Sequence, residues 1–255
     1  MMPKLLFVGG SGHSGTTLLA SILGAHSRIY SYRTETYVFR RDKRNLSDDQ
    51  MRASLERISA ERTKADVDYV CEKSPSHIRV CDDIFRLYPD AKFVAIKREP
   101  RDVVASFKRR GISVQSGLKN WYIAYRRLLQ WQRQRLPLYS LRFEDLISAP
   151  AQTLEGVCTY LGLPYEPAML EYWKDSANWQ GVKELRKPDA VTGKNHEIYR
   201  NWQVHQPLMR DRIGTYHADL SESELRLIDG QVSRVARKMG YSLEPTITVH
   251  GPPTP

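Results

Sequence analysis

The feature that most constrains the fold of this chain is a glycine-rich loop between a short apolar run and an apolar helical pattern. Lys4–Gly9 has the length and composition of a buried strand, and Thr16–Gly24 reads as a helix with a glycine near its end. The loop itself is Gly9-Gly10-Ser11-Gly12-His13-Ser14-Gly15-Thr16-Thr17. A strand, a glycine loop and a helix in this order favour an α/β fold.

The spacing of Gly10 and Gly15 is that of a phosphate-binding P-loop. Small residues let backbone N–H groups point inward, and the start of the helix adds partial positive charge, so such a loop holds an anion. A nucleoside triphosphatase has lysine directly after the second glycine, where this chain has Thr16. The loop therefore predicts phosphate binding and disfavours ATP or GTP hydrolysis; a plain glycine-rich turn is the alternative.

Strand and helix signals alternate along most of the chain. Further strands are expected at 69–71, 91–96 and 138–143. Helices are expected from about Ser47, over 78–88, from Pro100, and over 121–134, 150–161 and 221–238. The alternation predicts an α/β three-layer sandwich with a central, mostly parallel sheet of the P-loop NTPase-like kind.

The C-terminal third is less regular. Trp173–Pro207 has no sustained period, which is typical of a lid or binding loop. The segment 245–255 is rich in proline and is expected to be a poorly ordered tail. No linker or repeat interrupts the rest, so one domain over 1–244 is the prediction.

Composition narrows the class of protein. Lys and Arg number 39 against 29 Asp and Glu, a net charge of +10, which favours nucleic acid, an anionic membrane surface or a polyanionic small ligand. No window approaches the ~18 apolar residues of a membrane span, and the N-terminal apolar run is too short for a signal peptide. Cys71, Cys81 and Cys158 lack the spacing of disulfides or a zinc site, so free thiols and a cytoplasmic location are expected.

A second basic segment follows the predicted strand at 91–96. Arg98 stands at the end of this strand, while Ser106 and Arg110, four residues apart, share one face of the next helix. Two guanidinium groups and a hydroxyl can converge on one phosphate. The strand ends in Lys97-Arg98 where a triphosphatase has an acidic magnesium ligand, which favours binding without metal. A solvated basic helix is the alternative interpretation.

Together these segments resemble the sulfotransferases that use 3′-phosphoadenosine-5′-phosphosulfate (PAPS) as donor. The loop from His13 to Leu19 resembles their 5′-phosphosulfate loop, and the basic segment from Arg98 to Arg110 resembles their 3′-phosphate site. Leu141–Leu146 and Leu161–Pro164 are similar to the segments that follow, so the resemblance spans residues 4–165. It is nearest to the group with a Glu base, which includes tyrosylprotein and heparan sulfotransferases. The donor-binding residues that it implies are Gly12, His13, Ser14, Gly15, Thr16, Thr17, Arg98, Ser106, Arg110 and Lys194.

The resemblance also implies three catalytic residues. Glu35 lies where the Glu-using group has its general base, and Lys73 resembles the lysine that neutralises charge on the leaving phosphate. His13 stands where the family usually has Lys or Arg, a position that contributes positive charge to the 5′-phosphosulfate. At this position His13 is expected to donate a hydrogen bond to that group or to carry a pH-dependent positive charge. His77 is the competing base. In the irregular segment, the candidates for closing over the nucleotide or lining the acceptor pocket are Lys187, Lys194, Arg200, Trp202, Trp179 and Tyr199.

The function expected is metal-free, in-line transfer of a sulfuryl group from PAPS to a hydroxyl or amine acceptor, with 3′,5′-adenosine bisphosphate (PAP) as product. An acidic peptide and a glycan are candidate acceptors, and neither a nucleic-acid partner nor membrane insertion is expected. A P-loop kinase of a small metabolite is one alternative. Such a kinase needs a lysine in the loop and an acidic metal ligand, and this sequence has neither in place. A non-catalytic binder of nucleic acid or another polyanion is the other, and it has only the net charge in its favour.

Overall fold

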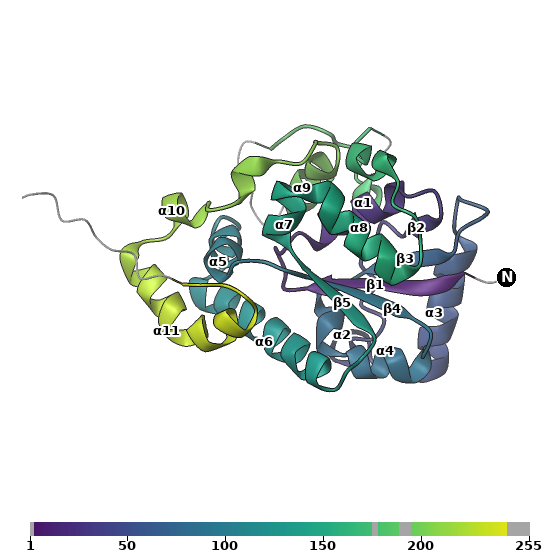
Figure 1. Cartoon of the computed structure of the whole chain (residues 1–255), viewed down its shortest axis with the longest axis horizontal. Helices are drawn as coiled ribbons and strands as arrows, with labels where there is room; N and C mark the ends of the chain where they lie inside the picture. Colours follow the sequence, from purple (N-terminus) through teal and green to yellow (C-terminus); the bar gives the residue numbers. More distant parts are fainter. Residues whose placement is uncertain (1–2, 175–177, 189–194, 244–255) are drawn as a thin grey trace, which may run out of the picture.

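A five-stranded sheet with parallel pairing throughout forms the centre of the molecule (Figure 1). The computed structural model describes residues 3–174, 178–188 and 195–243. The strands are β1 (Lys4–Gly10), β2 (Ile29–Ser31), β3 (Tyr69–Lys73), β4 (Lys92–Lys97) and β5 (Leu138–Arg142), and they lie in the order β2-β3-β1-β4-β5.

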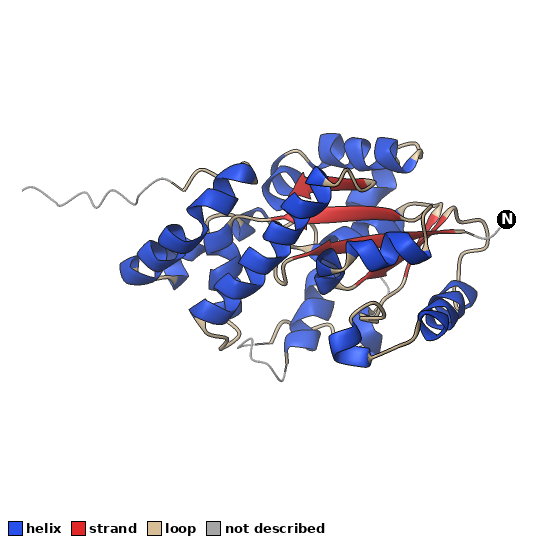
Figure 2. Ribbon diagram, turned by 90° about the horizontal axis from the view of Figure 1, so that it is seen from below, coloured by secondary structure: helices blue, strands red, loops and turns tan. Residues whose placement is uncertain are grey.

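Helices cover both faces of this sheet (Figure 2). They are α1 (Thr16–Ala25), α2 (Arg41–Arg44), α3 (Asp48–Ala60), α4 (Cys81–Leu87), α5 (Pro100–Lys108), α6 (Val114–Arg133), α7 (Phe143–Ser148), α8 (Pro150–Leu161), α9 (His196–Val204), α10 (Tyr216–Asp219) and α11 (Glu222–Lys238). Short 3₁₀ turns are η1 (Pro75–Arg79), η2 (Pro167–Glu171), η3 (Trp179–Gly181) and η4 (Arg210–Arg212).

The alternation of strand side chains divides the core into two layers. Phe7 and Phe93 contribute to the apolar cluster that α3, α4, α5, α6 and α11 cover, whereas Leu6 and Val94 contribute to the cluster under α1, α7 and α8. Successive residues of a strand point to opposite faces, so a sheet buried on both sides needs apolar residues at every position. The predicted three-layer α/β fold is confirmed.

Local sequence signals mark the starts of several helices. Ser47 and Ser221 cap α3 and α11 with complete capping boxes, and Pro100 begins α5. Several expectations were wrong in detail, and the helix expected over 121–134 begins seven residues earlier, at Val114. The short strand β2 was not predicted, the helix expected at 78–88 divides into η1 and α4, and the stretch interpreted as irregular contains α9.

The sheet order brings the predicted site segments to one edge. Parallel pairing sets Val8 of β1 beside Lys73 of β3, and Gly10 beside Ile96 of β4. The loops after these strands therefore emerge next to each other, at the edge where open α/β sheets bind ligands.

Across the described ranges, no helix has both the length and the apolar character needed to cross a membrane. The tail predicted at 245–255 lies outside the described residues.

Candidate active site

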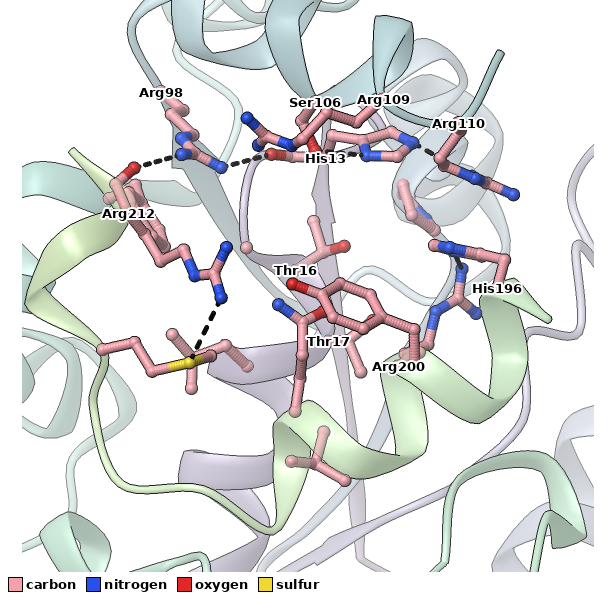
Figure 3. Close-up of a pocket in the computed structure, with 18 of the residues that line it drawn as sticks. His13, Thr16, Thr17, Arg98, Ser106, Arg109, Arg110, His196, Arg200 and Arg212 are labelled. Atoms are coloured by element: carbon pink, nitrogen blue, oxygen red, sulfur yellow. Dashed lines mark hydrogen bonds between the residues drawn. The ribbon is translucent and has the colours of Figure 1, made fainter. Parts of the chain in front are cut away.

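A cavity of about 400 Å³ opens at the carboxyl edge of the sheet (Figure 3). Thr16 and Thr17 at the start of α1 line it, and the labelled arginines are arranged around them. Its charged lining in the described part of the chain consists of six cations and one carboxylate: Arg98, Arg109, Arg110, Lys187, Arg200, Arg212 and Glu35. Such an excess of positive charge in a concave site suits a ligand with several negative charges.

The glycine loop is shaped to hold an anion at the start of α1. Gly15 is the N-cap residue at φ 90°, and no side chain caps the helix there, so its first N–H groups face the cavity without a side-chain partner. A Cβ on Gly15 would lie 2.6 Å from Phe143 Cδ2, and one on Gly10 would lie 2.5 Å from the Ile96 carbonyl oxygen. The loop therefore needs both glycines for its close approach to the neighbouring elements.

The loop is also fastened to α6. The Gly12 amide donates to Asn120 Oδ1 at 3.2 Å, and the Ser14 hydroxyl bonds the Tyr125 hydroxyl at 2.7 Å. Tyr125 in turn donates to the Ile96 carbonyl at 3.1 Å. Gly12 and Ser14 are accordingly not among the residues that line the cavity. Their prediction as donor-binding residues stays a prediction, and the structure assigns them contacts that hold the loop.

His13 joins the two predicted phosphate sites. Its backbone is left-handed at φ 65°, and its ring lies between the side chains of Ser106 in α5 and Arg110 just after that helix. Arg110 Nη1 lies 3.0 Å from His13 Nε2 and can only donate, so the ring hydrogen is on Nδ1 and is donated to Ser106 Oγ at 2.8 Å. Burial, with the positive charge of Arg110, holds the His13 pKa well below its usual value. The imidazole is therefore neutral in this state.

The predicted 3′-phosphate residues come together beside the loop. Arg98 is buried, donates from Nη1 to the His13 carbonyl at 3.0 Å and from Nη2 to the Arg212 carbonyl, and lies 4.3 Å from the Phe143 ring centroid. Ser106 of α5 and Arg110, two residues beyond the end of that helix, line the same cavity. Because Ser106 Oγ accepts from His13, its own hydrogen is left for a ligand.

Glu35 lies in a network of donors at the cavity wall. Its side chain is 5% exposed, its Oε1 contacts Lys73 Nζ, and Arg200 Nη1 lies 3.1 Å from the same oxygen. Tyr37 donates its hydroxyl to Oε2. Lys73 is fully buried, 4.3 Å from the centroid of the Trp179 ring. The loop after β2, the end of β3 and α9 thus meet at one carboxylate.

The electrostatics of this network keep both ends of the pair charged. Burial alone would raise the pKa of Glu35, but Lys73 and Arg200 outweigh it and lower that pKa to about 2. Burial lowers the pKa of Lys73 to about 8, against the opposing effect of Glu35. At neutral pH the carboxylate is ionised and the ammonium is largely protonated.

The competing base lies elsewhere. His77 Nδ1 is 2.9 Å from Glu72 Oε2, and both side chains are fully buried. The Phe39 amide also approaches His77 Nε2 at 3.4 Å. His77 does not line the cavity, so its placement favours Glu35 as the residue that meets an acceptor.

Several cavity residues were missed by sequence reasoning. Arg109 lies within the predicted 3′-phosphate segment but was not assigned a role, and Arg212 and His196 belong to stretches without a motif. Of the other candidates, Lys187, Tyr199 and Arg200 line the cavity, Trp202 does not, and Lys194 lies outside the described residues. Within those residues, no group of three His, Cys, Asp or Glu is placed to hold a metal ion.

Comparisons with known proteins give the following similarities. A family model described as "Sulfotransferase family" matches residues 3–167. A putative protein-tyrosine sulfotransferase of Caenorhabditis briggsae is 29% identical over 264 residues, which is 93% of this chain and 89% of that protein. A sulfotransferase domain from the curacin biosynthetic pathway superposes with a TM-score of 0.67 at 18% identity, covering 94% of this chain and 98% of that one. Mouse sulfotransferase SULT7A1 complexed with PAP gives 0.58 at 12% identity, with 94% and 86% covered.

Proposed function

Because the chain belongs to the sulfotransferase family, we propose that it transfers the sulfuryl group of PAPS to a hydroxyl group, with Glu35 as general base. The observation that carries this proposal is the cavity in which the P-loop, six cations and one buried carboxylate converge. The relative and the PAP-bound mouse enzyme support the reaction class and the donor.

The residues of the cavity fit a donor with two anionic ends. PAPS supplies an activated sulfuryl group on its 5′-phosphate and carries a second phosphate at the 3′ position. The N–H groups at the start of α1 suit the 5′ end, and Arg98, Ser106 and Arg110 suit the 3′ end. Arg98 Nε, Arg110 Nε and His196 Nδ1 are buried without hydrogen-bond partners in the part of the chain described, so they are available to acceptor oxygens.

Catalysis then rests on the buried pair. Glu35, ionised at neutral pH, takes the hydroxyl proton of the acceptor as the new S–O bond forms. The bond from sulfur to the bridging phosphate oxygen breaks. We assign the neutralisation of the negative charge that develops there to the Lys73 ammonium, which lies against Glu35 behind the residues that line the cavity. Arg200 lies against the same carboxylate oxygen of Glu35 as Lys73 does, so two cations orient the base.

We propose further that the acceptor is a tyrosine hydroxyl in a protein. The name of the Caenorhabditis briggsae relative supports this class of acceptor. The cations of the cavity would attract acidic residues that flank the acceptor tyrosine in its own protein. This agrees with the acidic peptide expected from the sequence. A glycan hydroxyl is the competing acceptor.

The test is a binding series followed by an acceptor screen. PAP should raise the melting temperature of the protein clearly, and ATP with magnesium should raise it less. Labelled PAPS should then transfer sulfate to tyrosine peptides with flanking acidic residues, more than to glycans or simple alcohols. If ATP with magnesium raises the melting temperature and PAP does not, PAPS is not the donor. If sulfate is transferred to glycans alone, the proposed tyrosine acceptor is wrong.

The cytoplasmic location also stays a proposal. Its support is that Cys71, Cys81 and Cys158 are free and buried, which suits a reducing compartment. A fluorescent fusion of the full-length protein in its own cells tests it. Signal in a secretory compartment would contradict it.

A further inference from the structure

A second groove lies between α6 and α11, and it shares no lining residue with the reaction cavity. Its volume is about 860 Å³. In Figure 1, α6 and α11 lie on the side of the sheet away from α9, which carries part of the reaction cavity. The groove is lined by Tyr122, Ile123, Arg126, Arg127, Leu129, Gln130, Arg133, Arg234, Val235 and Lys238.

The charge of this groove is wholly positive. All five of its charged side chains are exposed cations: Arg126, Arg127, Arg133, Arg234 and Lys238. No acidic residue lines it in the described ranges, and none of the five cations forms an ion pair there. Like charges gathered on one surface repel each other, so a negatively charged partner would relieve an unfavourable arrangement.

Cations of the neighbouring helix α5 form ion pairs with carboxylates of α11. Arg101 binds Asp229 of α11 with two hydrogen bonds, and Lys108 of α5 pairs with Glu224 at 2.8 Å. In the groove, the contacts of the cations are to uncharged groups of α6 itself. Arg127 donates to Gln130 at 2.9 Å, and Arg126 lies 5.6 Å from the Tyr122 ring centroid. The contrast sets the groove apart from the paired surface beside it.

The floor of the groove is apolar. Tyr122, Ile123 and Leu129 of α6 are half-buried, and Val235 of α11 is buried. Tyr122 and Leu129 also pack against the apolar cluster beneath α6, so this floor is the outer edge of that cluster. An apolar floor with a cationic rim matches a ligand that is itself amphipathic.

The spacing of the cations fits a helix. Arg126 and Arg133 are seven residues apart, about 10 Å along α6 at the usual rise per residue. A partner helix repeats its carboxylates at the same interval, with apolar residues between them on the same side. A flat membrane surface fits a concave groove less well, and a nucleic-acid duplex, whose bases are stacked inside, offers no apolar face for its floor.

We propose that the groove between α6 and α11 docks an acidic amphipathic helix of a partner protein. The carboxylates of that helix lie against the cations of both rims, and its apolar side chains cover the floor. This docking is separate from donor binding and from the chemistry, and it adds a macromolecular partner to the small-molecule site.

The experiment uses the full chain and two double variants that remove the same charge. Arg126→Gln with Arg234→Gln takes one cation of the groove from each helix. Lys119→Gln with Arg237→Gln takes one exposed cation outside the groove from each of the same helices. The probes are a labelled amphipathic helical peptide with Glu and Leu on one face, and its twin with every Glu replaced by Gln. Binding is followed by fluorescence anisotropy, and folding by thermal melting.

The Glu peptide should bind the wild-type protein, and the Gln peptide should not. The groove variant should weaken the Kd about fivefold to tenfold, the sum of two exposed ion pairs, and the matched variant should leave it unchanged. Sulfation of a free phenol should be equal in all three proteins. Equal weakening by both variants would mean attraction to net charge alone and would overturn the proposal. Preferred binding of a single-stranded oligonucleotide or of phosphatidylserine vesicles, lost in the groove variant, would overturn the proposed partner.

Discussion

Glu35 and Lys73 form an ion pair that is almost wholly removed from solvent, although the two residues come from different strand-to-loop connections. Lys73 ends β3, and Glu35 lies in the loop that follows β2. A buried pair of this kind leaves an uncompensated charge if one member is lost. It therefore links the chemistry of the site to the stability of the sheet edge.

Glu35→Gln should reduce turnover about 10²–10⁴-fold, the usual contribution of a general base, while PAP affinity does not fall. The variant should also melt earlier, because Lys73 and Arg200 lose their carboxylate. Adding Lys73→Met should restore thermal stability but not turnover, which separates the two effects. Wild-type turnover in Glu35→Gln would place the base at another residue.

The rate should depend on pH through Lys73. Its pKa of about 8 means that the ammonium is present below pH 8 and is lost as the pH rises through that value. The value of kcat/KM for PAPS should therefore fall on the alkaline side near pH 8, whereas Glu35, with a pKa of about 2, gives no acid limb between pH 5 and 7. Lys73→Arg should move the alkaline limb upward. A profile for the wild type that stays flat to pH 10 would contradict this role.

Ser106→Ala should weaken PAP binding about tenfold or more, the scale of a hydrogen bond to a charged group. Adenosine 5′-monophosphate, which lacks the 3′-phosphate, should bind both proteins equally. Isothermal titration with the two nucleotides checks this. An equal loss for both would show that Ser106 acts only by holding His13, whose Nδ1 it contacts at 2.8 Å.

Donor binding should draw a proton onto His13. The pKa of this imidazole is held low by burial and by Arg110, and a bound polyanion raises it because it favours the charged form. PAP affinity should therefore increase as the pH falls, and calorimetry in two buffers of different ionisation enthalpy should detect proton uptake. His13→Gln should abolish the uptake. Identical heats in both buffers for the wild-type protein would contradict the prediction.

Sequence reasoning located the parts of the site whose signals are local. The glycine loop stands directly after one strand and Arg98 directly after another, so parallel pairing alone brings them together. Lys73 and Glu35 needed the family resemblance as well, because a single Lys or Glu in a loop has many other uses.

The parts that sequence reasoning missed depend on contacts between distant residues. The buried side chains of α9 are His196, Asn201 and Val204, and only the last is apolar, so no periodicity marked the helix. Asn201 accepts from the Trp179 amide at 2.7 Å, which ties α9 to η3. Arg212 lines the cavity, and the residues that follow it are held in place by Asp102. The Asp102 carboxylate accepts a hydrogen bond from the Gly214 amide at 2.9 Å.

The contacts between the glycine loop and α6 have a thermodynamic consequence. A loop already held through Asn120 and Tyr125 loses little conformational freedom when a nucleotide arrives. The opposite wall of the cavity comes from a separate part of the chain, because α9 carries Arg200 and His196. Recognition of the donor therefore starts from a half-site that the fold has already assembled.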